Sequence, residues 1–147
     1  MGFELMNRLE VLSRAHGLVM QVYRATESFP KAEQFGIVSQ IRRAAVSIPT
    51  NICEGKGRGS DLEFLRFLAI ARASLLEVRY LTLLSKDLGY WGPDTYRKIE
   101  SDLDDIASMI SKMNTAVRRT LSEQRSVRTN QLSGKRTAES PRRRFPT

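Results

Sequence analysis

The sequence contains a single histidine, His16, and a single cysteine, Cys53, and this restricts the chemistry open to its side chains. Zinc sites, iron–sulfur clusters and disulfide frameworks each need several such residues, so the composition excludes all three. A Ser-His-Asp triad would depend on His16, which we interpret instead as a packed or interface residue in an apolar helical stripe. Cys53 is interpreted as a small core residue. The sequence therefore predicts neither a bound metal nor a cofactor.

Neighbouring carboxylates are the remaining candidates for acid–base catalysis or for binding a divalent cation. Asp102, Asp104 and Asp105 cluster in one segment, but the apolar residues between them mark the core face of a helix, so we expect the acids to face solvent. The glycines of residues 55–59 lack the order of a phosphate-binding loop and do not follow a strand. We therefore expect that the protein is not an enzyme.

The chain is strongly basic, with 24 Lys and Arg against 16 Asp and Glu. Residues 1–122 carry a net charge of +3, whereas residues 123–147 carry +5 and contain few apolar side chains. Such a segment cannot bury enough apolar surface to offset the entropy of ordering it. We therefore expect a folded domain over residues 1–122 and a disordered basic tail over residues 123–147. The longest apolar run, Phe67–Ala71, is too short to span a membrane, and we expect a cytoplasmic protein.

Apolar residues recur at helical spacing along most of the domain, while no segment shows the sustained alternation of a strand. The expected helices cover residues 5–27, 31–57, 61–88 and 94–121. Short connections make successive helices antiparallel neighbours. The predicted fold is all-α, an up-down-up-down antiparallel four-helix bundle. In the first, second and fourth helices the expected core stripes are Leu9, Leu12, His16, Val19 and Tyr23; Val38, Ile41, Ala45, Ile48 and Ile52; and Tyr96, Ile99, Leu103, Ile106, Ile110, Met113 and Val117.

Two local signals refine these helices. Pro49 lies inside the second helix and removes one backbone hydrogen bond, but Ile52 stays in phase with Ile48. We therefore expect a kink at Pro49 and not a stop. Ser60 and Glu63 have the spacing of a capping box, which predicts that the third helix begins just after Ser60.

The third helix carries apolar residues around most of its circumference, more than one core stripe requires. One explanation is deep burial inside the monomer. The other is that the surplus surface contacts a second subunit, and we favour it because every helix of a four-helix bundle has a solvent side. We expect Leu65, Leu76 and Leu83 to lie in this oligomer interface.

A resemblance to a known family rests on residues 36–68. The first group of matching positions is the run Gly36–Gly55, which includes the string QIRRAAVSIPTNI. The matching positions that follow it are Arg58, Ser60, Glu63, Phe64, Phe67 and Leu68. Further matches lie upstream, at Tyr23, Thr26, Phe29 and Pro30, and downstream, at Leu88, Gly89 and Tyr90. The chain resembles the four-helix-bundle proteins encoded in intervening sequences of bacterial large-subunit ribosomal RNA genes. The resemblance covers about residues 8–119, and it departs from the family where Leu12 replaces a frequent Trp and Cys53 a frequent Ala.

This resemblance implies a cytoplasmic bundle that assembles as a homopentamer. It also implies kinship with the accessory variability proteins of diversity-generating retroelements, which are basic pentamers that bind nucleic acid and a partner reverse transcriptase. The family has no established catalytic activity. We therefore expect an oligomeric accessory factor that binds RNA or DNA and works with a reverse transcriptase or at ribosomal RNA.

The expected nucleic-acid contacts are basic residues at one end of the bundle, in the second helix and in the tail. They are Arg42, Arg43, Lys56, Arg58, Arg118, Arg119, Arg142, Arg143 and Arg144. Arg42 and Arg43 can equally pair with Glu54, Glu63 or Glu77 within or between subunits. The alternative function is a protein-interaction scaffold whose positive charge has no role in binding nucleic acid. Salt dependence of binding distinguishes the two, because phosphate contacts release counterions.

Overall fold

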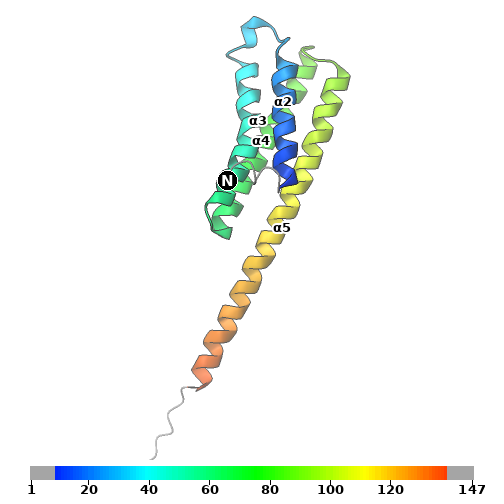
Figure 1. Ribbon diagram of the computed structural model, residues 1–147. Coiled ribbons are helices and arrows are strands. Elements are labelled where there is room, and N and C mark those ends of the chain that lie inside the picture. The colour runs from blue at the N-terminus through cyan, green and yellow to red at the C-terminus, as the bar shows by residue number, and fades with distance from the viewer. Residues whose placement is uncertain (1–8, 139–147) are drawn as a thin grey trace, which may run out of the picture.

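The structure is a computed structural model that describes residues 9–138, and four long helices dominate it (Figure 1). The elements are α2 (Glu10–Thr26), η1 (Lys31–Glu33), α3 (Ile37–Gly57), α4 (Asp61–Asp87) and α5 (Pro93–Ala138). Each helix contacts its neighbour along the chain, and α5 also contacts α2, so the four helices close into a bundle. The described residues contain no strand, and the predicted all-α four-helix bundle is confirmed. None of the described helices is long and apolar enough to cross a bilayer.

The core confirms two of the three predicted stripes and corrects the third. The predicted residues of the second helix are all buried, and those of the fourth are buried from Ile99 to Ile110. In α2 the buried face is shifted by about one position: Val11, Ala15, Leu18 and Val22 are buried together with Leu12. His16 and Tyr23, which were expected in the stripe, are exposed instead. Two overlapping stripes compete in this helix, and the face with the small Ala15 gives the closer approach to its neighbours.

The interface between α3 and α4 includes small and polar residues at which the two helices approach closely. A Cβ added to Gly55 would stand only 2.5 Å from Cβ of Phe67, so no larger residue fits there without movement. The Ser47 and Ser74 hydroxyls lie 2.8 Å apart across the interface, and the Asn51 amide donates to the Ser47 hydroxyl at 2.9 Å. The conspicuous string in the second helix therefore builds a helix–helix contact.

The predicted signals at Ser60 and Pro49 are confirmed, but two helices begin later than predicted: α2 begins at Glu10 after an extended Leu9, with the predicted residues 5–8 outside the described residues, and α3 begins at Ile37. The Ser60 hydroxyl accepts a hydrogen bond from the Glu63 N–H at 3.4 Å, as the capping box predicts, and α3 continues through Pro49 without ending. Residues 31–36 were expected to be helical, but only the short η1 forms there. The chain breaks at Gly36, whose φ of −104° and ψ of −115° are not helical. A carboxylate oxygen of Glu33 accepts from the Ile37 N–H at 3.4 Å and so supports the new helix start.

The end of the bundle that holds the α4–α5 turn is closed by aromatic residues. The ring of Phe29 lies 5.0 Å from that of Tyr90 and 5.2 Å from that of Trp91. The Trp91 indole donates to the Thr82 carbonyl at 3.2 Å, and the Tyr90 hydroxyl donates to Glu33 at 3.0 Å. Because of these contacts the loop after α2 and the turn before α5 form one closed cap.

The opposite end differs most from the sequence-based expectation, because α5 runs far past the bundle (Figure 1). Residues 123–138 were expected to belong to a disordered tail, yet they continue α5 as helix to Ala138. Leu121 is the last half-buried side chain, and residues 122–134 are exposed. Starting a helix is the costly step, and the packed part of α5 has already made it, so the polar residues need only propagate the helix. Residues 139–147 lie outside the described residues.

Candidate nucleic-acid interface

The first half of α5 is acidic, and its acidic side chains are neutralised by ion pairs. Residues 93–105 contain five acidic and two basic side chains, a net charge of −3. Every one of these acids pairs with a cation of α2, α4 or α5. The pairs are Asp94 with Arg97, Glu100 and Asp104 with Arg79, Asp102 with Lys98, and Asp105 with Arg14. The acidic cluster that the sequence drew attention to is therefore a set of ion pairs.

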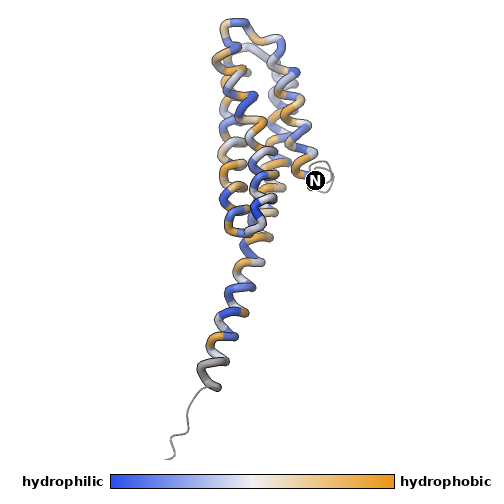
Figure 2. Tube along the Cα trace, turned by 60° about the vertical axis from the view of Figure 1, so that its left-hand side comes forward, coloured by the Kyte–Doolittle hydropathy of each residue, from blue (hydrophilic) through white to orange (hydrophobic). Residues whose placement is uncertain are grey.

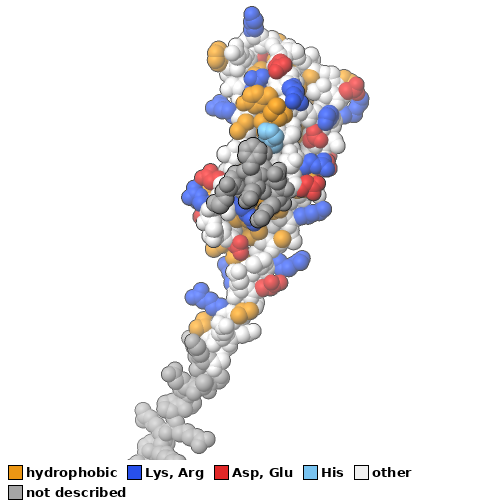
Figure 3. All heavy atoms as spheres, viewed as in Figure 1, with side chains coloured by type: hydrophobic (Ala, Val, Ile, Leu, Met, Phe, Trp, Pro, Cys, Tyr) orange, Lys and Arg blue, Asp and Glu red, His pale blue; other side chains and the backbone are white. Residues whose placement is uncertain are grey.

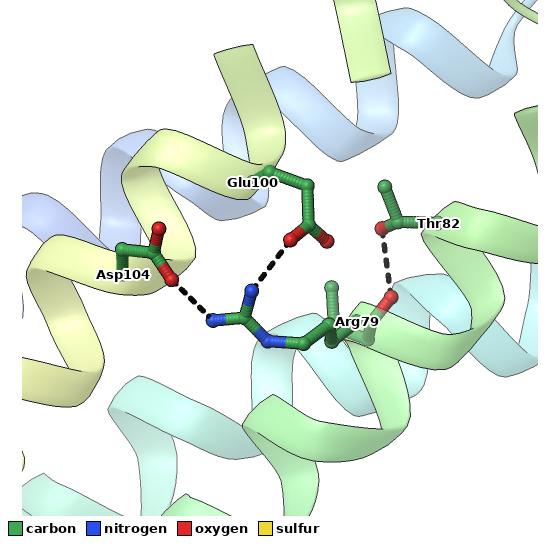
Figure 4. Close-up of polar contacts among 5 residues, drawn as sticks. Arg79, Thr82, Glu100 and Asp104 are labelled. Atoms are coloured by element: carbon green, nitrogen blue, oxygen red, sulfur yellow. Dashed lines mark hydrogen bonds and ion pairs between the residues drawn. The ribbon is translucent and has the colours of Figure 1, made fainter. Parts of the chain in front are cut away.

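Arg79 forms the most enclosed of these contacts, between α4 and α5 (Figure 4). Its guanidinium donates to Glu100 at 2.5 Å and to Asp104 at 2.8 Å. Partial burial lowers the pKa of Arg79, but the hydrogen bonds and negative charges of Asp104 and Glu100 outweigh that effect and raise the pKa above its usual value. Arg79 therefore stays charged and joins two helices.

The second half of α5 has the opposite character. Residues 106–134 contain five basic side chains and one acidic one, a net charge of +4. The cations are Lys112, Arg118, Arg119, Arg125 and Arg128. None of them forms an ion pair with a described carboxylate, and all are exposed. Figure 3 shows Lys and Arg side chains standing out from α5 below the bundle.

A groove between α4 and α5 joins this cationic segment to the bundle. Arg72 and Leu76 of α4 line one side, and Asn114 and Arg118 of α5 line the other. The Arg118 side chain donates to Asn114 at 2.8 Å, which orients its guanidinium. Arg72 has no acidic partner among the described residues. Arg72 was not among the predicted contact residues, because its position across the groove from Arg118 depends on how the two helices pack.

The predicted cations at the α3–α4 corner are present, but they are partly engaged. Arg58 pairs with Glu54 at 2.7 Å and lies over the ring of Phe67 at 5.1 Å. The Lys56 ammonium lies 5.0 Å from the centre of the Phe64 ring. Both rings are almost fully buried, at 5% and 4% exposure, so neither can stack on a base. Lys56 is therefore the freer cation of this corner.

Arg42 and Arg43 have different surroundings although they are adjacent. The Arg42 guanidinium donates to the Thr26 hydroxyl at 2.9 Å and to the Tyr23 carbonyl at 3.2 Å, and it covers the Tyr23 ring. Arg42 thus holds the end of α2 against α3. Arg43 is exposed in a shallow hollow that Glu77 also lines, with no ion pair between them.

Of the remaining candidates from the sequence, the structure describes His16 and Cys53. His16 is exposed and not packed in the core. Cys53 is half-buried, and burial raises the pKa of its thiol, which therefore stays protonated at neutral pH. No three His, Cys, Asp or Glu side chains within the described residues are placed to hold a metal ion. Arg142, Arg143 and Arg144 lie outside the described residues.

One further surface is left uncovered by the described residues. Large apolar side chains line the outward side of α4, and this α4 outer face consists of Leu62, Leu65, Leu76, Tyr80 and Leu83. Leu65 is half-buried, whereas Leu76, Tyr80 and Leu83 are 55%, 62% and 40% exposed. The three residues predicted for an oligomer interface thus share one side of the helix.

Comparison with known proteins places the chain. No curated protein matches it. A solved structure similar to it is a protein of unknown function from the S23 ribosomal protein family of Bacteroides thetaiotaomicron. The two share 22% identity over 71% of this chain and 97% of that one, with a TM-score of 0.64, so they share the fold. Residues 7–112 match the 23S rRNA-intervening sequence protein family. The chain therefore belongs to the 23S rRNA-intervening sequence protein family.

Proposed function

We propose that this protein is a non-enzymatic, oligomeric bundle that binds nucleic acid through contacts to phosphates, with little base specificity. The single observation that carries the proposal is the set of five unpaired cations between residues 106 and 134 of α5. The cations of the acidic half of α5 have carboxylate partners, whereas those of the other half form no ion pair with a described carboxylate. Its simplest ligand is a polyanion.

Low base specificity follows because the aromatic rings near the predicted cations are not exposed. Sequence-tolerant binding of single strands uses exposed aromatic rings on which bases stack. Phe64 and Phe67 are near Lys56 and Arg58, but both rings are buried. Phosphate contacts alone position a protein on nucleic acid without reading its sequence.

The α4 outer face supports the oligomeric part of the proposal, with a second copy of the chain as its occupant. The family resemblance favours a homopentamer. Exposed leucines in a row are costly in water, and a symmetric assembly covers the same face on every subunit. Assembly would also bring several cationic α5 helices together and raise the effective concentration of phosphate contacts.

Sedimentation of Leu76→Arg tests the assembly. The variant should shift the wild-type oligomer towards a monomer near 16.7 kDa while helix content stays the same. Ser108→Arg, an exposed change on α5, is the matched control and should leave assembly intact. A wild-type chain that sediments as a monomer at micromolar concentration would contradict the oligomer.

The proposed partners are therefore a further copy of the chain and RNA or DNA, in the cytoplasm, with no catalytic step. A reverse transcriptase is a further proposed partner, supported only by the kinship with accessory variability proteins. Membership of a family named after a 23S rRNA gene supports ribosomal RNA as a place of action. Co-purification of the chain with a reverse transcriptase encoded beside its gene tests the proposed reverse-transcriptase partner directly.

Salt dependence of nucleic-acid binding tests the central claim. The full chain should bind a labelled duplex tightly at 50 mM salt, and its affinity should fall by about three orders of magnitude by 200 mM salt if six or more phosphates are contacted. A flat dependence, or no binding at 50 mM salt, would favour a scaffold that contacts only proteins.

A further inference from the structure

Beyond the bundle, no other described element packs on the sides of α5. Residues 122–134 are exposed, and Figure 2 shows this segment as mostly hydrophilic and far from the other helices. The Ser126 and Thr129 hydroxyls donate to carbonyls four residues earlier, at 3.1 and 3.0 Å, so these side chains fold back on the helix. A slim, isolated helix is about 10–12 Å wide with its side chains.

Three of the four arginines in residues 118–134 lie on one face of the helix, and Arg119 lies on the other side. At 100° per residue, Arg118, Arg125 and Arg128 fall within an arc of about 80°, and they extend over about 15 Å along the axis. The one acid, Glu123, falls on the opposite side. Arg118 also lines the α4–α5 groove opposite Arg72. This basic stripe, Arg118, Arg125 and Arg128, therefore begins at the bundle, which fixes the direction in which it faces.

Amide side chains lie beside the stripe or opposite it: Gln124 and Gln131 are about 80–100° from its centre, and Asn130 is on the side of Glu123. The amides of Gln124, Asn130 and Gln131 are exposed and make no hydrogen bond within the described residues. An amide side chain can donate to and accept from an adenine edge in the major groove at the same time. Phosphate contacts fix the position of a helix on DNA, and exposed amides can add groove contacts without reading a fixed sequence, in agreement with the low base specificity proposed above.

We propose that residues 118–134 of α5 enter the major groove of double-stranded DNA, with the basic stripe on the phosphates. The inference rests on the proposed nucleic-acid function and narrows its ligand to one class. The B-form major groove is about 12 Å wide and admits an α-helix. The A-form RNA groove is deep and narrow and does not admit one.

Other occupants fit this segment less well. Single-strand binding uses aromatic side chains, and residues 118–134 contain none. A coiled coil with a second copy needs apolar residues three and four apart, whereas the exposed Val127 and Leu132 are five apart. Duplex RNA offers the same phosphates as duplex DNA but lacks a major groove wide enough for a helix, so comparing the two duplexes tests the inference.

The experiment compares affinities of the full chain for four probes of the same sequence at 100 mM salt. The probes are duplex DNA, duplex RNA, and the single strands of each. Duplex DNA should bind at least about tenfold more tightly than duplex RNA, because the B-form major groove admits the helix and the A-form major groove does not. Equal affinity for both duplexes overturns the inference but leaves the proposed function standing. If no probe binds even at 50 mM salt, both fail.

A charge-matched variant tests the face of the helix. Arg125→Ala with Arg128→Ala removes two cations of the stripe, and adding Thr120→Arg and Val127→Arg restores the net charge on the other side. The double and the quadruple variants should both lose about tenfold or more in affinity for duplex DNA, and the salt slope should fall by about two units. A quadruple variant that binds like the wild type shows that only total charge matters, and overturns the inference.

Competition identifies the groove. Methyl green occupies the major groove and should displace the protein, whereas netropsin occupies the minor groove and should not. Displacement by netropsin alone contradicts the inference. Circular dichroism of the free variants confirms that each keeps its helix content, so that a loss of affinity reports lost contacts.

Discussion

The two halves of α5 belong to one continuous helix but obey different physical constraints. Residues 93–105 are acidic, and every acid has a cationic partner. Residues 106–134 are basic, and beyond Leu121 their side chains are all exposed. The first half is explained by the stability of the bundle. The second contributes nothing to the core after Leu121, so its charge is better explained by something outside the monomer.

The largest expected difference between the halves concerns apolar side chains. Ile106→Ala removes a fully buried side chain from the core and should lower the free energy of unfolding by about 3 kcal/mol. Leu132→Ala removes a side chain that is 59% exposed and should change the free energy of unfolding by less than about 0.5 kcal/mol. Urea denaturation measures both. Equal losses would show that the extension packs in solution.

Shortening the chain to residues 1–122 should separate stability from binding. Affinity for duplex DNA should fall by about a hundredfold, because two described arginines and the basic residues after them are lost. The thermal unfolding midpoint should stay within about 2 °C of the full chain, since the removed residues 123–134 are exposed and outside the described core. An unchanged affinity would place binding on the bundle and remove the distinction between the halves.

An arginine in each half gives a smaller contrast. Arg79→Met leaves Glu100 and Asp104 without their partner and should cost about 1–2 kcal/mol of unfolding free energy. Arg118→Met breaks only a bond to Asn114 on the same helix and should cost less than about 0.5 kcal/mol, while weakening DNA binding. Paired unfolding and binding measurements on the two variants should therefore show opposite losses.

The smallest effect concerns pH at the closed end of the bundle. The hydrogen bond to Glu33, together with burial and the carboxylate charge, raises the pKa of Tyr90. The folded state thus favours protonated tyrosine, so this stabilisation is present below the unfolded pKa of about 10 and is lost as pH rises through the folded pKa. Tyr90→Phe should be less stable than wild type at pH 8, and the gap should narrow at strongly alkaline pH. A constant gap between the two pH values would argue against the bond.

Much of this fold was predictable because the helical periodicity agreed with the residues that cap or end helices. Local sequence patterns alone determine the core stripes of α3 and α5. The same is true of the helix cap at Ser60 and the continuation of α3 through Pro49. The stripe of α2 was misplaced because two faces of that helix carry apolar residues, and only packing decides between them. The break at Gly36 was missed because a helical pattern on both sides of it hid the turn.

The candidate site was harder to predict than the fold. The polar composition of residues 123–138 predicted disorder, but α5 continues through them. The prediction failed because composition carries no information on whether a packed helix precedes the segment and can propagate into it. Arg42 looked as free as Arg43, and only the arrangement of α2 against α3 shows that it binds Thr26 and Tyr23. Pairing of cations across helices depends on geometry that a linear pattern does not contain.

The aromatic cap has a practical consequence as an optical reporter. Trp91 is the only tryptophan of the chain, it is 8% exposed, and it lies in the turn before α5, at the far end of the bundle from the extension. Its emission should therefore shift to longer wavelength when the bundle melts and stay constant when DNA binds to the extension. Intrinsic fluorescence and the anisotropy of a labelled duplex can then be recorded in one cuvette as two independent signals.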